Sequence, residues 1–336
     1  MSPTLDEIAA LTNVSRATVS RAINGGPIAD ATRRRIMSVL EQTNYRPNTA
    51  ARSLAMGHSG VVGVAMHIDS HLLFQDPYFA QLLQGISDVL CEHEAAMMLW
   101  VGNRTKEDTL QHILRRGILD GVIVTANQQE DPLVDGLLAS SIPTVIVGHR
   151  NSDPTASYVD IDNAHAADVV TSHMIKTGRR RIGHVTGSRG TSAAEDRLAG
   201  YERAMRRAGL ATDGLVVDGD FNKPSGVTGA AILMDAGVDA IFCANDAEAS
   251  GALETIRGRG LCVPEDIALA GFDDLEFSAH LEPPLTTIRQ GVRQQGSEAA
   301  NVLFELLRDP TGGSRRVLLP TELVIRQSTV GGVQRG

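Results

Sequence analysis

The sequence predicts an α/β protein in which an N-terminal all-α head precedes a body of two doubly wound parallel-sheet subdomains. Three observations support this prediction. The chain of 336 residues is too long for one compact core and fits two or three domains. Its first 46 residues have the apolar spacing and the caps of three short helices. From residue 61 onward, short apolar runs alternate with amphipathic helices.

The head is predicted to be a helix-turn-helix. Thr4 and Glu7 form a capping box at the start of the first helix, and Ser15 is placed to cap the second. The helices are expected from residue 5, over residues 16–23 and over residues 30–43. The second helix has Val19 on its apolar side and small and basic residues on the other, as in helices that enter the major groove. Any three-helix bundle has similar apolar spacing, so this pattern alone leaves DNA binding open.

The charge of the chain is divided unevenly. The formal net charge is -9, but residues 1–60 carry seven arginines and four acids, a net charge of +3 that leaves -12 for residues 61–336. Phosphate contact needs a basic patch locally rather than a basic total, because counterion release depends on the local charge. Within the head, the run Arg33, Arg34 and Arg35 is interpreted as a solvated helix face.

A short helix is expected over residues 48–56, capped by Asn48 and ended by Gly57. At roughly nine residues it is too short to be stable alone in water, so it needs a partner in order to form. Leu54 faces no obvious core of its own domain, which favours a binding role over that of an ordinary linker.

The body is expected to use one βαβ plan twice. Its unbroken apolar runs imply strands buried on both faces, and hence parallel sheets covered by helices. Ligands of such sheets bind beyond the C-terminal ends of the strands. The strands are expected at residues 61–66, 96–101, 121–125, 144–147, 182–186, 215–217, 240–243 and 267–271, with helices that include 78–93, 164–176 and 192–209.

Catalytic and cofactor motifs are missing from the sequence. It has no Walker loop, nucleophile elbow or histidine cluster, and the glycines after residue 182 miss the dinucleotide fingerprint. Cys91, Cys243 and Cys262 lie far apart, as expected of reduced thiols. No apolar stretch approaches the ~20 residues of a membrane span, and no secretory signal is seen. We therefore expect a cytoplasmic protein that is not an enzyme and needs no cofactor or metal.

Three segments resemble the lactose-repressor (LacI/GalR) family of transcription regulators: LDEIA at 5–9, VSRATVSR at 14–21 and NYRPN at 44–48. The resemblance continues to residue 330. It implies that Arg16 and Ala17 choose operator bases, Arg16 either through a bidentate contact to guanine or as a phosphate clamp, and Ala17 through its methyl group. It also places further residues near DNA, mostly to position the backbone: Ser15, Thr18, Ser20, Arg21, Asn24 and Thr32.

The resemblance also implies a role for residues 48–56. In the family, two such hinge helices of a dimer fold together in the minor groove, where the residue matching Leu54 wedges between base pairs. Asn48 and Ala51 are implied to contact DNA from the same helix. The implied domains are a DNA-binding domain at 1–46, a hinge at 47–58, and an effector-binding and dimerisation domain at 59–336. The last resembles a periplasmic sugar-binding protein, with subdomains at about 60–161 plus 290–319 and about 162–289 plus 320–330.

Polar residues near several strand ends are implied to hold a small-molecule effector. Arg197 would donate to ligand hydroxyls and Asp273 would accept from them, unless the two only form a pair that stabilises the cleft. Asn245 can donate and accept at once. Phe221 stands where the family places a ring against the ligand, with core packing as the alternative. Gln290 follows the crossover segment.

The first cleft loop carries Asp76, Tyr78 and Phe79, a carboxylate and two rings. Two departures from the family leave the effector open: residues 67–75 form a longer loop than usual, and His149 stands where many relatives have an aspartate. Hydroxyl-binding groups with one or two stacking rings favour a sugar or sugar derivative. A nucleobase, which would use more aromatic rings and specific amide donors, ranks second.

The sequence therefore predicts a homodimeric, sequence-specific repressor whose operator affinity is controlled by a small molecule in the cleft. The lack of trailing heptads predicts a dimer without a coiled-coil tetramer tail. One rival is a solute-binding protein or enzyme on the same fold, which the helical head and the missing signal and catalytic groups argue against. The other is a nucleoid-type binder indifferent to sequence, which would not explain the polar cleft residues.

Overall fold

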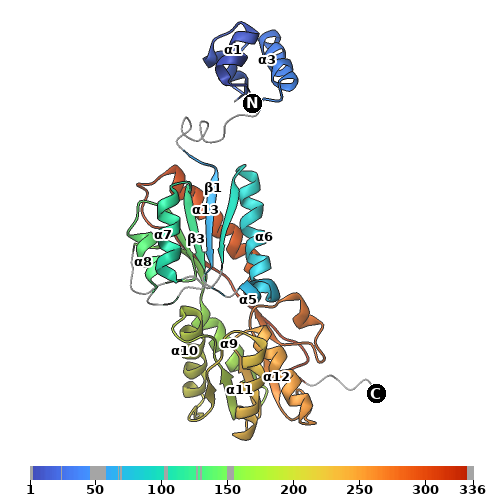
Figure 1. Ribbon diagram of the computed structural model, residues 1–336. Helices are drawn as coiled ribbons and strands as arrows, with labels where there is room; N and C mark the ends of the chain where they lie inside the picture. Colours follow the sequence, from blue (N-terminus) through green and yellow to red (C-terminus); the bar gives the residue numbers. More distant parts are fainter. Residues whose placement is uncertain are drawn as a thin grey trace. The chain divides into compact units, whose positions relative to one another are not determined.

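The computed structural model describes residues 3–23, 25–45, 58–66, 68, 70–101, 105–125, 128, 131–149 and 155–330, with no statement on the side chains of residues 71, 72 and 116. The chain separates into two compact units, Met1–Ser59 and Gly60–Gly336 (Figure 1). Four residues with implied DNA contacts lie outside the described residues, and their roles stay predictions: Asn24, Asn48, Ala51 and Leu54.

Three helices form the first unit, as predicted: α1 at Leu5–Thr12, α2 at Arg16–Ile23 and α3 at Asp30–Gln42. The capping box is present, because Glu7 N donates to Thr4 Oγ1 and Thr4 N donates to Glu7 Oε2 at 2.7 Å. Ile8, Val19 and Ile36 are fully buried, one from each helix. The head therefore has its own small core, which fixes the angle between α1 and α2.

The interpretation of the arginine run as a solvated face is wrong for Arg33, which contacts α2. Its Nη1 donates to Ala22 O at 2.9 Å and its Nη2 donates to Gly26 O at 2.7 Å. These carbonyls lie at and just beyond the C-terminal end of α2, where helices leave acceptors unsatisfied. Arg34 and Arg35 are exposed, as interpreted. Arg33 therefore holds α3 to the end of α2.

A six-stranded parallel sheet forms the first half of the second unit, in the order β11-β5-β4-β3-β1-β2. Its strands are β1 at Val61–Met66, β2 at Ala96–Val101, β3 at Gly121–Thr125, β4 at Thr144–Val147, β5 at Ser157–Ile161 and β11 at Arg316–Leu319. One face is covered by α6 (Pro77–Glu92) and α13 (Val292–Arg308), and the other by α7 (Lys106–Arg116) and α8 (Pro132–Leu138) (Figure 1). We call this half the six-strand lobe; α5 (Ser70–Gln75) precedes α6.

A four-stranded parallel sheet forms the second half, in the order β7-β6-β8-β9. Its strands are β6 at Ile182–Val185, β7 at Val216–Val217, β8 at Ala240–Cys243 and β9 at Ala268–Ala270. The helices α9 (Asn163–Lys176) and α10 (Ser192–Arg207) cover one face, and α11 (Lys223–Asp235) and α12 (Asp246–Gly258) cover the other. A short 3-10 helix follows at Glu276–Ala279. We call this half the four-strand lobe.

The chain passes between the lobes three times. It leaves the six-strand lobe after β5, returns to it through α13 after β10 (Thr287–Arg289), and leaves again after β11 for β12 (Glu322–Val324). The short strands β10 and β12 pair antiparallel with each other. The sequence predicted the wound sheets but not β5, β10, β11 or β12, which carry charged residues or span only three residues.

The helices α6 and α13 approach closely at two glycines. A Cβ atom at Gly85 would lie 1.9 Å from Arg293 O, and one at Gly296 would lie 2.2 Å from Leu82 O. Both positions therefore require glycine, because any side chain would push the two helices apart. This contact fixes α6, and with it the residues at the N-terminus of α6 that face the other lobe. Among the helices described, none is long and apolar enough to cross a membrane.

Candidate effector cleft and DNA-binding surface

One cavity of about 420 Å³ lies between the two lobes and is lined by residues of both. Its volume is in the range of roughly 300–1,000 Å³ that is typical of small-molecule pockets. All eight residues to which the sequence assigned effector contacts line it: Asp76, Tyr78, Phe79, Arg197, Phe221, Asn245, Asp273 and Gln290. They come from segments between residues 76 and 290, brought together because strands of both sheets end at this cleft.

Arg197 reaches the cavity from α10 and is only 5% exposed. Its Nε donates to Asn163 Oδ1 at 2.9 Å, and its Nη1 donates to Ala244 O at 2.6 Å. The guanidinium carbon lies 3.7 Å from the centroid of the Phe272 ring, a cation–π arrangement. Among the described residues none accepts a hydrogen bond from Nη2. The fork is therefore held rigidly while part of its donor capacity stays available.

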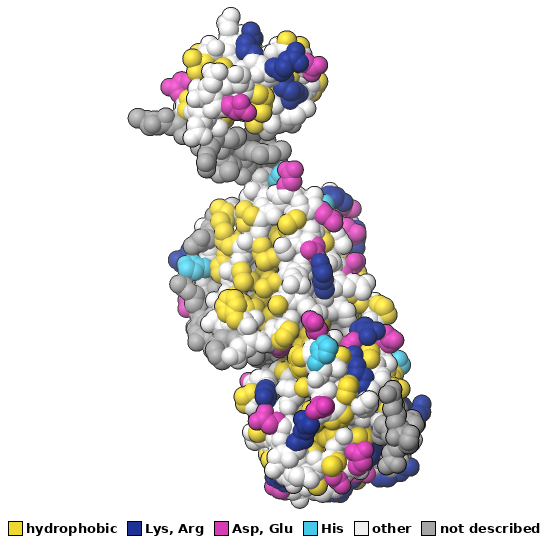
Figure 2. Space-filling view, turned by 90° about the vertical axis from the view of Figure 1, so that its right-hand side faces the viewer, with side chains coloured by type: hydrophobic (Ala, Val, Ile, Leu, Met, Phe, Trp, Pro, Cys, Tyr) yellow, Lys and Arg dark blue, Asp and Glu magenta, His cyan; other side chains and the backbone are white. Residues whose placement is uncertain are grey.

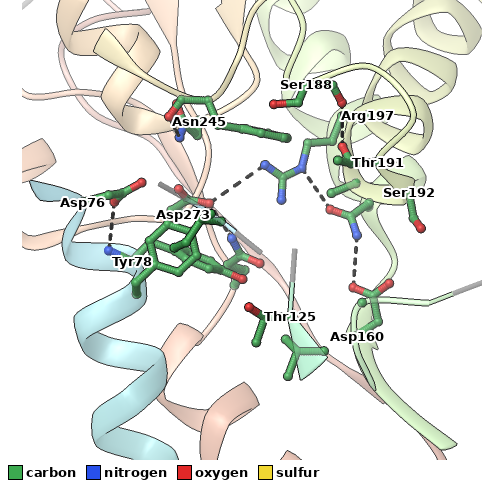
Figure 3. A pocket seen from close by; sticks show the side chains of 18 of the residues that line it. Asp76, Tyr78, Thr125, Asp160, Ser188, Thr191, Ser192, Arg197, Asn245 and Asp273 are labelled. Atoms are coloured by element: carbon green, nitrogen blue, oxygen red, sulfur yellow. Dashed lines mark hydrogen bonds and ion pairs between the residues drawn. The ribbon is translucent and has the colours of Figure 1, made fainter. Parts of the chain in front are cut away.

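Asp273 lies close to Arg197 in the wall of the cavity (Figure 3). Its backbone φ is +115°, and its Oδ1 accepts a hydrogen bond from Gln290 Nε2. Gln295 Nε2 in turn donates to Gln290 Oε1 at 2.9 Å, so α13 supports this carboxylate from the six-strand lobe. Burial raises the pKa of Asp273 well above its usual value, although the Arg197 charge acts in the opposite direction.

The side chain of Asn245 is hydrogen-bonded to the backbone of Phe221. Asn245 Nδ2 donates to Phe221 O at 2.8 Å, and Asn245 Oδ1 caps α12 by accepting from Glu248 N at 2.8 Å. Both polar atoms of Asn245 therefore have protein partners, which the sequence did not predict. Phe221 has a positive φ of 55°, and its ring lines the cavity.

Glu248 holds the loop of Phe221 in place and was missed by the sequence analysis. It is fully buried, and its Oε1 accepts from Phe221 N at 3.0 Å, Asp220 N at 3.1 Å and Ser225 Oγ at 3.0 Å. Its Oε2 accepts from Ala244 N at 3.1 Å. Burial raises the pKa of Glu248 to about 8, while these hydrogen bonds act to lower it. The carboxyl group thus ties the β7–α11 loop to the start of α12.

The six-strand lobe contributes a carboxyl group and two rings. Asp76 caps α6, accepting from Tyr78 N at 2.9 Å, and burial raises its pKa. The rings of Tyr78 and Phe79 meet edge to face with centroids 5.2 Å apart. Desolvation also raises the pKa of Tyr78, so this phenol stays neutral and can donate a hydrogen bond.

Thr125 lines the cavity and was also missed by the sequence analysis. It ends β3, is 3% exposed and faces the cavity (Figure 3). Its hydroxyl group has no hydrogen-bond partner among the described residues. A buried hydroxyl without a partner is unfavourable, so a ligand group is the natural partner here. The rule that ligands bind beyond strand C-termini would have identified Thr125 from the predicted strand 121–125.

His149 joins the two lobes at the edge of the cavity. Its Nδ1 lies 2.6 Å from Asp160 Oδ2 at the end of β5, and its Nε2 lies 3.5 Å from Asp196 Oδ2 on α10. Ser192 Oγ at the start of α10 donates to His149 O at 2.5 Å. Asp160 and Ser192 also line the cavity. The departure from the family at this position therefore introduces a contact between lobes rather than a further ligand carboxylate.

The predicted DNA-reading residues lie on α2 and around it. Arg16, Ala17 and Arg21 are exposed, and the Arg16 side chain lies 3.6 Å from the Asp6 carboxylate. Thr18 N donates to Ser15 Oγ at 3.2 Å, which caps the start of α2 as predicted. The remaining two, Ser20 and Thr32, are half-buried. Within the described parts of the chain, no group of histidine, cysteine or acidic residues is arranged to hold a metal ion.

A helix-turn-helix head and a two-lobed body with a ligand-sized cleft define a DNA-binding regulator with a small-molecule sensor. Comparisons with known families agree. Residues 4–48 match the bacterial regulatory proteins of the lacI family, and residues 171–329 match the periplasmic binding protein-like domain. The chain belongs to the LacI family of bacterial regulatory proteins.

Relatives and solved structures match the chain over nearly its whole length. The HTH-type transcriptional regulator CelR of Thermobifida fusca is 35% identical over 97% of this chain and 98% of its own. The HTH-type transcriptional repressor PurR of Photobacterium profundum is 31% identical with the same coverage. A structure of the CelR–cellobiose complex is similar with a TM-score of 0.77 and 33% identity, covering 97% of this chain and 99% of that one. The structure of the lac repressor dimer bound to operator and the anti-inducer ONPF is similar with a TM-score of 0.86 and 26% identity. The match covers 98% of this chain and 99% of that one.

These relatives confirm the predicted fold and the predicted function of a DNA-binding transcriptional repressor under small-molecule control. They are transcriptional regulators and not enzymes, as the sequence predicted.

Proposed function

We propose that the protein is a homodimeric repressor acting in the cytoplasm, and that a sugar or sugar derivative bound between its lobes controls its affinity for operator DNA. The observation that carries the proposal is the lining of the cleft, which combines carboxyl and hydroxyl groups with aromatic rings. Sugar hydroxyls donate and accept hydrogen bonds, and sugar rings stack on aromatic faces. The similar CelR structure, which is a complex with cellobiose, supports the same class of ligand.

A nucleobase is the second candidate, because several relatives are named PurR. Reading a base edge needs free amide groups, since these match its adjacent donors and acceptors. In this cleft Asn245 bonds Phe221 O and Glu248 N, and Gln290 bonds Asp273 and Gln295. Protein partners thus already engage the amides of Asn245 and Gln290, the two that the sequence assigned to the effector, and this favours the sugar.

We assign the effector contacts to the eight residues predicted from the sequence and add Thr125, whose hydroxyl lacks a partner. Arg197 and Asp273, whose Nη1 and Oδ1 atoms lie 4.0 Å apart, would bind the same ligand hydroxyl group or neighbouring ones. Phe221 from the four-strand lobe and Tyr78 and Phe79 from the other lobe would stack against its faces. Because the contacts come from both lobes, a bound sugar favours the closed arrangement of the cleft.

We propose that operator recognition follows the predicted set, with Arg16 and Ala17 reading bases and Ser15, Thr18, Ser20, Arg21, Asn24 and Thr32 positioning the backbone. Exposure of Arg16, Ala17 and Arg21 on α2 supports this assignment. The hinge at 47–58, with Asn48, Ala51 and Leu54, is proposed to order only on DNA in a dimer. We also propose the domain borders predicted from the sequence. They are 1–46 for the DNA-binding domain, 47–58 for the hinge and 59–336 for the sensor, whose subdomains lie at about 60–161 plus 290–319 and about 162–289 plus 320–330.

The six-strand lobe supports the proposal of a dimer. Its edge strand β2 exposes Leu99, and Leu114 and Ile118 are exposed at the end of α7 and just beyond it. Figure 2 shows apolar side chains gathered on one face of this lobe. The lac repressor structure that matches the chain is a dimer on its operator. Two copies that bury such a face would present two heads to a palindromic site.

A thermal-shift screen of the full chain tests the ligand class. The panel contains glucose, galactose, ribose, cellobiose and maltose beside adenine, guanine and hypoxanthine. A ligand at 100 times its Kd stabilises the fold by about 2.7 kcal/mol, which raises the Tm by several degrees. We expect a neutral sugar to give the largest shift. A shift with the purines alone would contradict the sugar assignment.

A further inference from the structure

We propose that the cleft selects an uncharged ligand and excludes phosphorylated or carboxylated sugars. This inference rests on the proposed function and narrows it, because both neutral and anionic sugars would satisfy a cleft rich in hydroxyl partners. It depends on the charges that line the cavity and on which of them already have partners.

Carboxyl groups outnumber cationic side chains in the lining. The described lining residues include four acids, Asp76, Asp160, Asp220 and Asp273, but only two cations, Lys106 and Arg197. Three of the acids are at least nine-tenths buried, so water screens them little. An anion entering this cavity would meet more carboxyl groups than cations at short range.

Each of the two cations lies near a carboxylate of the protein, Lys106 near Asp131 and Arg197 near Asp273. Lys106 Nζ lies 2.9 Å from Asp131 Oδ2, a carboxylate that is 2% exposed, and also donates to Gln128 Oε1 at 2.7 Å. Arg197 Nη1 lies 4.0 Å from Asp273 Oδ1 and donates to Ala244 O. A phosphate group would have to compete with Asp131 or Asp273 for these charges. A hydroxyl group would not, because it can bond Arg197 and Asp273 at the same time.

Buried acids also lie behind the lining. Glu248 and Asp246 are fully buried, and burial raises their pKa values to about 8 and about 7. Asp76 and Asp273 on the lining also have raised pKa values, with burial as the first cause. These groups resist ionisation because burial takes the carboxylate away from water. An anion bound nearby would raise these pKa values further, so its binding would be coupled to proton uptake at any of these groups that is ionised.

Matched pairs of ligands test the inference on the full chain. We would titrate glucose against glucose 6-phosphate, galactose against galacturonate, cellobiose against its 6′-phosphate, and guanosine against guanosine 5′-monophosphate, using calorimetry at pH 7. The member of each pair without charge is expected to bind at least about 100-fold more tightly, because one extra charge meets several unscreened carboxylates. Tighter binding of the anion in any pair would overturn the inference.

Two variants link the selectivity to named charges. Asp76→Asn keeps a residue that caps helices well while removing an acid from the lining. It should reduce the ratio of neutral-ligand affinity to anionic-ligand affinity by roughly tenfold in each matched pair. Asp131→Asn also keeps its cap and leaves Lys106 without its carboxylate partner, so it should raise the affinity for the anion. The control Asp235→Asn removes a charge that pairs with Arg259 outside the cavity and should change nothing. The same ratio of neutral-ligand to anionic-ligand affinity in the wild type and all three variants would contradict the inference.

The outcomes separate the two proposals. Preference for a sugar anion contradicts the inference and leaves the sugar-controlled repressor standing. Binding of guanosine without binding of any sugar contradicts the sugar assignment and leaves the exclusion of anions standing. If no member of any pair binds at millimolar concentration, both proposals fail.

Discussion

Nη1 of Arg197 lies 4.0 Å from Oδ1 of Asp273, within ion-pair distance but beyond hydrogen-bond distance. The sequence left open whether these two residues hold a ligand or only each other. In the structure each is fixed by a different partner, Arg197 by Asn163 and Ala244 O, and Asp273 by Gln290. The pair is therefore placed so that a hydroxyl group can bridge it, as in a cleft organised before its ligand arrives.

The first prediction concerns Arg197→Lys. The variant keeps the positive charge but loses the planar fork that faces Asn163 and the cavity. We expect effector affinity to fall on the order of 10–100-fold, since hydrogen bonds to a charged group are lost. Calorimetry measures this loss, and binding to operator without ligand should be unchanged. The matched control is Arg203→Lys on the same helix, where the arginine bonds Asp168 outside the cavity; an equal loss in the control would contradict the role of Arg197.

Thr125→Val tests the hydroxyl group that has no partner. Valine matches threonine in shape, so the unliganded protein should keep or slightly increase its Tm. Effector affinity should fall by roughly tenfold because one hydrogen bond to the ligand is lost. Thermal melts with and without the effector report both quantities. Unchanged affinity would remove Thr125 from the site.

Glu248 predicts how the stability of the sensor depends on pH. Its pKa rises from an ordinary 4.5 to about 8 in the fold, so the native state binds a proton more tightly than the unfolded chain. The free energy of unfolding gained in this way is present below about pH 4.5 and is lost as the pH rises to about 8, with a slope of at most about 1.4 kcal/mol per pH unit. Urea unfolding at several pH values in this range should show that the free energy of unfolding depends less steeply on pH in Glu248→Gln than in the wild type. Parallel pH profiles would contradict the prediction.

Leu54→Ala tests the hinge, whose structure lies outside the described residues. If the leucine wedges into the operator, its truncation should weaken operator binding by at least about tenfold while the sensor keeps its Tm and its effector affinity. Leu318→Ala, at an exposed leucine of β11, is the control of identical chemistry. Gel-shift titrations of the two variants compare them. Equal operator affinity in both would contradict the hinge account.

Much of the fold follows from the sequence, because its elements have local signals. Buried strands such as β1 and β3 are unbroken apolar runs, and helices such as α6 begin at residues that cap well. β11 and β12 lack such signals. Their residues are exposed or half-buried, and each strand pairs with another that is more than 30 residues away in sequence. Pairing at that distance depends on the three passages between lobes, which no local pattern contains.

The candidate site was predicted in part. The resemblance and the strand-end rule identified eight residues that line one cavity, since strand C-termini of both sheets converge there. Glu248 and Arg33 were missed for a different reason. Their partners are backbone groups of loops that only the folded chain brings near, Phe221 N for Glu248 and Ala22 O and Gly26 O for Arg33. A sequence shows the charge of such a residue but not the backbone atoms it will meet.

The central claim is that a neutral sugar in the cleft changes the affinity of the head for its operator. The most direct test is fluorescence anisotropy with an operator selected from random DNA by the full chain, measured with and without the sugar that gives the largest thermal shift. We predict a change of about 5–150-fold in operator Kd, as expected for coupled sites, and no change for random-sequence DNA. The same operator Kd with and without saturating sugar would contradict the account.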